Sequence, residues 1–150
     1  MSRLSTNILS FRIGIGAQEG AEIERILMAA DLPESVMHGD PEFVDLATER
    51  RVWRAVVAAT GREDIGLLCG LRFPTQAMGV LGYVMANSPN LWVVLDKTCH
   101  YAELMGDSMG WRYTRGPNQT KVWIEQWSDW HDPLRYTVDC MMASLPSWAT

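Results

Sequence analysis

Apolar residues recur at helical spacing through much of the first hundred residues. One run covers 21–30 and ends before Pro33, because the residue before a proline avoids the helical conformation. A longer run covers 46–60, and Gly61 follows it as a residue suited to the left-handed conformation that ends helices. Residues 8–16 alternate only in part and contain two glycines, so a strand and a frayed helix both stay open there.

Two further helices are predicted on either side of a break at 87–90. Before them, Asp64 is expected to cap a short turn at 65–70. Ser88 is a good helix cap and Pro89 suits a first helical turn, so the second helix is expected to begin there. Its apolar positions follow the rhythm of a helix with one buried face: Leu91, Val94, Leu95, Thr98, Ala102 and Met105.

After Gly106 the period of the apolar positions changes from helical to two residues. Strands are predicted at 109–113 and 121–127, joined by a turn at 116–119. Asp132-Pro133 then repeats the signature of a cap followed by proline, and a final helix is expected to bury Leu134, Val138, Met141 and Leu145. The predicted fold class is therefore α+β, with helices in N-terminal and central positions, a small antiparallel sheet or hairpin late and a closing C-terminal helix.

The composition is that of one globular domain. The chain has 150 residues, of which 47% are hydrophobic and 21% charged, so it is long enough to bury a sizeable core. Its formal net charge is −5, and no cluster of basic residues stands clear of acidic neighbours, which excludes direct contact with DNA or RNA. No apolar run is long enough to cross a bilayer, so no membrane contact is expected. The charged residues of the first helices are expected on outer, solvated faces: Glu22, Glu24, Arg25, Glu49, Arg50, Arg51 and Arg54.

The sequence predicts no enzyme, no metal site and no cofactor. Its three cysteines form no C-x-x-C pair and its three histidines show no metal-ligand spacing, a pattern typical of a reduced, cytoplasmic protein. Adjacent residues diverge on a helix, so Cys99 and His100 cannot pair as nucleophile and base. Asp132 is explained as a helix cap and His131 as a solvated loop residue.

Tryptophan and methionine are abundant for so short a chain, with seven of the first and nine of the second. Bulky residues of this kind pack an ordinary core, which is one interpretation of their number. They are also typical of an apolar pocket, because methionine adapts its shape and tryptophan adds a polar tip. If there is a pocket, the hairpin and the helix before it are expected to line it with Met78, Tyr83, Met85, Trp111, Tyr113, Trp123 and Trp127.

The segment 60–105 carries the most specific pattern in the chain. It contains Thr60-Gly61, Gly66-Leu67, Gly70, Leu81-Gly82-Tyr83, Ser88-Pro89, Leu91 and the basic–aromatic pair His100-Tyr101. In the order and spacing of these residues, the segment resembles the N-terminal effector-sensing domain, the so-called arabinose-binding type, of AraC-family bacterial transcription regulators. The chain does not resemble the many-stranded barrel of the arabinose sensor itself, so the resemblance does not imply that arabinose is its ligand.

The resemblance implies a single domain over 1–150 that binds a small effector, often dimerises and is normally followed by two helix-turn-helix motifs. No such motifs occur here, so the chain is expected to be part of a longer regulator and to reach DNA only through a C-terminal domain that it lacks. The expected partners are thus a small-molecule effector and a second copy of the chain. A homodimerisation module without a ligand and a small enzyme acting on an apolar substrate are the alternatives.

Overall fold

The computed structural model describes residues 2–107, 109–126 and 135–149. Helices dominate it, and two small antiparallel sheets complete it. The elements are, in chain order, β1 (Arg3–Ser5), α1 (Thr6–Gln18), α2 (Ile23–Ala29), η1 (Glu34–His38), β2 (Phe43–Asp45), α3 (Leu46–Thr60), α4 (Ile65–Leu71), η2 (Thr75–Met78), α5 (Gly79–Ala86), α6 (Leu91–Tyr101), η3 (Ala102–Leu104), β3 (Met109–Arg115), β4 (Thr120–Gln126), α7 (Arg135–Ser144) and η4 (Leu145–Ala149).

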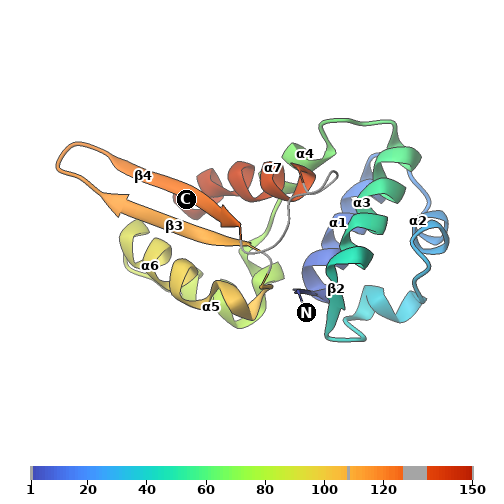
Figure 1. The fold of residues 1–150 in the computed structure, drawn as a ribbon, viewed down its shortest axis with the longest axis horizontal. Coiled ribbons are helices and arrows are strands. Elements are labelled where there is room, and N and C mark those ends of the chain that lie inside the picture. Colours follow the sequence, from blue (N-terminus) through green and yellow to red (C-terminus); the bar gives the residue numbers. More distant parts are fainter. Residues whose placement is uncertain (1, 108, 127–134, 150) are drawn as a thin grey trace.

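The elements gather into two ends joined by a pair of packed helices (Figure 1). α1, α2 and α3 form one end with the short β1–β2 sheet, and α5, α6 and the β3–β4 hairpin form the other. α4 and α7 pack along each other between them. The α+β class, with its late hairpin and closing helix, is confirmed.

The first strand ties the two ends together, and the sequence pattern did not indicate it. β1 pairs antiparallel with β2, with Leu4 opposite Val44. Its other side reaches the segment after α6, where Ser5 donates a backbone hydrogen bond to Met105 over 2.7 Å. Residues 8–16, which the pattern left open, belong to α1, and its Leu9 and Ile13 are fully buried.

The helix bounds follow the predicted pattern closely, apart from two caps. Asp64 stands at the start of α4 (Ile65–Leu71), but its side chain makes no capping hydrogen bond there and accepts from Arg62 instead. α3 covers Leu46–Thr60, and Gly61 ends it in the left-handed conformation with φ 66°. The prediction that Ser88 caps α6 was wrong. The Asn90 side chain accepts from the Val93 amide at 3.1 Å, whereas the Ser88 hydroxyl donates to the Val84 carbonyl of the preceding helix. The helix therefore begins two residues later than expected, because asparagine competes well for the cap position.

The closing helix buries a different face from the predicted one. Val138, Met141 and Leu145 are only half-buried, and Leu134 lies outside the described residues. The buried positions of α7 are Tyr136, Thr137, Cys140 and Ser144. α4 lies against this face, and Thr137 finds polar partners on α3, which removes the cost of burying its hydroxyl.

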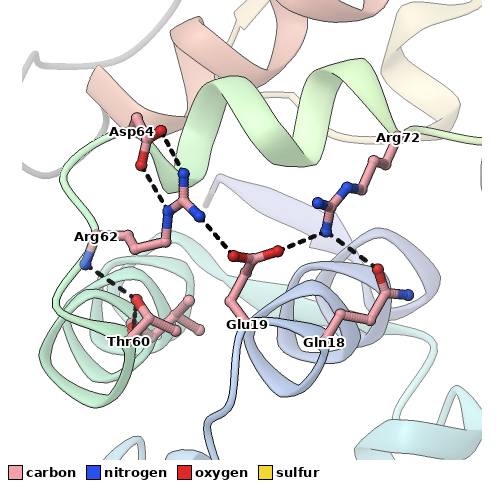
Figure 2. Close-up of polar contacts among 7 residues, drawn as sticks. Gln18, Glu19, Thr60, Arg62, Asp64 and Arg72 are labelled. Carbon is pink, nitrogen blue, oxygen red and sulfur yellow. Dashed lines mark hydrogen bonds and ion pairs between the residues drawn. The ribbon is translucent and has the colours of Figure 1, made fainter.

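A cluster of charges fastens the end of α1 to both ends of α4 (Figure 2). The Glu19 carboxylate accepts from Arg62 at 2.6 Å and from Arg72 at 2.7 Å. Arg62 also donates two hydrogen bonds to Asp64, at 2.8 and 2.7 Å. The hydrogen bond from Arg72, and the one from Arg62, hold the pKa of Glu19 below its usual value.

We expect this cluster to stabilise the protein at neutral pH and to stop doing so in acid. A carboxylate whose pKa is lower in the folded than in the unfolded chain contributes stability above the unfolded pKa, and loses it as the pH falls through the folded one. Glu19→Gln should therefore lower the free energy of unfolding in urea at about pH 7, and the difference from the wild type should shrink towards about pH 3. A difference of the same size at both pH values would contradict the role given to this carboxylate.

Candidate functional site

An apolar cavity lies where the two ends of the molecule meet. The cavity is lined on one side by β1, α1 and α3, and on the other by α6, η3, β3, α7 and η4. About 90 Å³ of it can hold the centre of a water molecule, and about 690 Å³ of space lies between its atoms when the open side is included. The lining residues are Leu4, Ile8, Arg12, Glu49, Phe73, Met78, Thr98, Ala102, Met105, Gly106, Met109, Gly110, Trp111, Thr137, Cys140, Met141, Ser144 and Trp148.

Much of the cavity wall consists of adaptable or aromatic side chains. Four of the nine methionines line it: Met78, Met105, Met109 and Met141. The rings of Trp111 and Trp148 meet edge to face, with their centroids 5.2 Å apart, so β3 and η4 close the wall together. Because a methionine side chain changes shape at little cost, such walls fit apolar molecules of several shapes.

One side of the cavity carries a buried ion pair. Arg12 of α1 donates to Glu49 of α3 over 2.5 Å, and the two side chains are 3% and 1% exposed. The same carboxylate oxygen accepts from the Thr137 hydroxyl at 2.7 Å, and Thr137 in turn accepts from the Trp53 indole at 2.7 Å. The Arg12 guanidinium also lies over the Trp53 ring, 4.8 Å from its centroid. This network joins α1, α3 and α7.

The positive charge of Arg12 persists in the interior. Burial works to lower the pKa of Arg12, but the charge of Glu49 and its hydrogen bond outweigh burial, so the pKa is raised overall. Burial also raises the pKa of the Cys140 thiol in the cavity wall, and that of Cys69 behind it to about 12. Thiols in this state are poor nucleophiles, so Cys140 acts as a neutral part of the wall.

Among the described residues, three buried polar atoms of the cavity wall lack a hydrogen-bond partner. They are Nε of Arg12, Oε2 of Glu49 and Nε1 of Trp148. A buried donor or acceptor left without a partner costs free energy, and in native proteins such atoms are few. All three belong to side chains that line the cavity, and the atoms themselves are shielded from solvent, so a molecule bound there would supply the missing hydrogen bonds after a small movement of the wall.

Two of the predicted pocket residues line this cavity, namely Met78 and Trp111. Met85 is buried nearby and lines a second, more polar hollow beside Asn90. Tyr83 is 72% exposed on the outside of α5 and lines neither.

The register of the β3–β4 hairpin places Tyr113 and Trp123, two of the remaining predicted pocket residues, on opposite faces. Tyr113 lies opposite Val122, two positions along from Trp111 on the same face, and packs against the core. Trp123 pairs with Arg112 and so lies on the other face of the hairpin, since neighbours along a strand point to opposite sides. Trp127 lies outside the described residues.

Sequence reasoning missed the polar residues of the cavity. Glu49 was expected on the solvated side of its helix, and that expectation was wrong, because it is among the most buried side chains of the protein. A signal was present: Glu49 stands four residues before Trp53, so the two share one helix face. No comparable signal links Arg12 or Trp148 to that face.

Other candidate chemistry is not assembled in the described part of the chain. There, no three His, Cys, Asp or Glu residues come together as a set that could hold a metal ion. His100 packs edge to face on the neighbouring Tyr101 ring, with centroids 4.6 Å apart. No helix in the described ranges has both the length and the apolar character needed to cross a membrane.

Comparison with known families gives one match. Residues 20–150 match the family described as the arabinose-binding domain of AraC transcription regulators, N-terminal. The matched segment includes every cavity wall except β1 and α1, so Arg12 lies before it. No curated protein matches the chain.

Proposed function

Because this chain belongs to the family of N-terminal arabinose-binding domains of AraC transcription regulators, we propose that it senses a small effector in the cavity beside Arg12 and Glu49. The observation that carries the proposal is the cavity itself, an apolar space with three unpartnered polar atoms in its wall. A mostly apolar hollow with a few convergent polar groups is the usual form of a small-molecule site.

The proposed effector is amphipathic rather than a sugar. A sugar carries a hydroxyl on nearly every carbon, and each hydroxyl buried without a partner costs free energy. The hydroxyls in the cavity wall already donate elsewhere: Thr98 to Val94, Thr137 to Glu49 and Ser144 to Met141. The methionines and tryptophans of the wall suit an apolar body instead.

The position of the cavity allows a bound effector to affect both ends of the molecule. Its walls come from both ends of the molecule, so an effector there contacts α1 and α3 as well as α6, β3 and α7. A ligand shifts a conformational equilibrium by its difference in affinity for the two states. In the proposed regulator, this shift would reach DNA in the cytoplasm through a C-terminal helix-turn-helix domain joined to this chain, in a homodimer.

A homodimerisation module without an effector is the second candidate, and an apolar surface favours it. Leu67 and Leu71 of α4 and Met142 of α7 are exposed, Leu71 by 64%. α4 and α7 pack along each other, and apolar side chains on such a pair suit a two-fold interface. A chain of this second kind would dimerise with rising concentration and would not respond to any cavity ligand.

Filling the cavity should block effector binding. Ala102 lines the cavity, and Ala102→Leu is expected to weaken the binding of eight-carbon amphiphiles about tenfold or more, because overpacking a filled site costs about 1–3 kcal/mol. The panel is octan-1-ol, octanamide, octanoate and octylamine, measured by tryptophan fluorescence and by the melting temperature of the protein.

Ala58→Leu serves as the control, since Ala58 is exposed on α3 and lies outside the cavity. It should leave binding unchanged. If no member of the panel binds, or if both leucine variants bind like the wild type, the cavity is not the effector site.

A further inference from the structure

We infer that the effector is uncharged and that its head group both donates and accepts hydrogen bonds at Arg12, Glu49 and Trp148, as a hydroxyl or a carboxamide does. This inference rests on the proposed function, because it specifies what the same cavity binds. It follows from three features of the wall: which atoms lack partners, which are already engaged, and how the charges balance.

The unpartnered atoms are of both kinds. Nε of Arg12 and Nε1 of Trp148 can only donate, whereas Oε2 of Glu49 can only accept. The three side chains are 3%, 8% and 1% exposed, so bulk water is a poor substitute for a bound partner. A head group that satisfies both kinds must itself accept one hydrogen bond and donate another.

The other polar side-chain groups that line the cavity already make hydrogen bonds. Oε1 of Glu49 already accepts from both Arg12 and Thr137, and the Thr137 hydroxyl accepts from Trp53. Thr98 and Ser144 donate to carbonyls of their own helices. The unpartnered side-chain donors of the wall are thus those of Arg12 and Trp148, and Oε2 of Glu49 is its unpartnered carboxylate oxygen, so the head group is placed at these atoms and its apolar body among the methionines.

The charges at the cavity favour an uncharged molecule. Of the described residues that line it, Arg12 and Glu49 are the charged ones, and they neutralise each other over 2.5 Å. A carboxylate ligand would bring a second negative charge beside Glu49, and an ammonium ligand would bring a second positive charge beside Arg12. Either ion would also lose its hydration on entering, a penalty that an uncharged head group avoids.

The direct test compares head groups on one apolar body. Octan-1-ol, octanamide, octanoate and octylamine are titrated into the wild-type chain at about pH 7, where the last two are charged. We expect the alcohol and the amide to bind at least about tenfold more tightly than either ion. If octanoate or octylamine binds as tightly as octan-1-ol, and Ala102→Leu still blocks it, the head-group inference is wrong while the cavity remains the effector site.

A charge change should reverse the preference. Glu49→Gln keeps the shape of the side chain but leaves Arg12 without its counter-ion, so octanoate should gain affinity and octan-1-ol should lose it. Unchanged selectivity in a folded Glu49→Gln variant would overturn the inference.

A second substitution does not disturb the ion pair. Trp148→Phe removes the Nε1 donor and retains an aromatic ring beside Trp111, so the alcohol and the amide should each bind several-fold more weakly. Trp92→Phe is the matched control, because Trp92 is half-buried beneath Arg115 and does not line the cavity. Equal effects of the two phenylalanine substitutions would remove Trp148 from the site.

Discussion

Replacing Glu49 by methionine is expected to lower the free energy of unfolding by about 3–5 kcal/mol. The substitution leaves the Arg12 guanidinium buried without its counter-ion, and it removes the acceptor of the Thr137 hydroxyl. Burying an uncompensated charge is among the most costly changes that a core tolerates. Urea denaturation of the single variant against the wild type measures the loss.

The double variant Arg12→Met/Glu49→Met tests the explanation. If the cost of the single change comes from the unpaired charge, removing both charges should restore much of the lost stability, because a buried ion pair can be replaced by apolar residues at little cost. A double variant less stable than either single variant would show that the two side chains stabilise the fold independently. In that case the network would not be a coupled pair.

The second large effect is expected where α4 crosses α7. A Cβ added to Gly70 would stand 2.3 Å from the Cys140 carbonyl oxygen and 2.6 Å from the Ala143 side chain. Since backbone atoms cannot move aside as a flexible side chain does, Gly70→Ala should separate the helices and cost about 3 kcal/mol or more. Thermal and urea unfolding both report this loss.

Gly14→Ala provides the matched control within α1. No atom outside that helix lies within 4 Å of the added Cβ, and alanine favours a helix over glycine by up to about 1 kcal/mol. This variant should therefore be as stable as the wild type or more so. Similar losses at Gly70 and Gly14 would show that the close approach of α4 and α7 is not what requires glycine.

The family could be predicted from one segment, and the match over residues 20–150 confirms it. The glycines of that segment have physical roles that sequence alone left unexplained. Gly70 admits the backbone of α7, and Gly82 lies against η2, where a Cβ would stand 1.7 Å from the Thr75 carbonyl oxygen. These two glycines thus mark places where two elements approach too closely for any side chain.

Periodicity by itself determined most of the helices, the hairpin and their order, because it depends on neighbours two to four residues away. It left α1 open and did not indicate β1. α3 from Leu46 to Thr60 and the strands on either side of the turn at 116–119 follow from such local patterns. The same local view did not identify which face of α7 is buried. That choice depends on α4 and on the Thr137 partners, which are distant in the chain.

Only the tertiary structure decided what surrounds the cavity. Met78 and Trp111 could be proposed from composition, but the polar side depends on Arg12 meeting Glu49, a residue 37 positions away, and on Trp148 at the opposite end of the chain. No periodicity relates positions so far apart. Their meeting is a consequence of how α1, α3, α7 and η4 pack. This packing buries Glu49, which was expected to be solvated, and brings Arg12 and Trp148 into the same cavity wall.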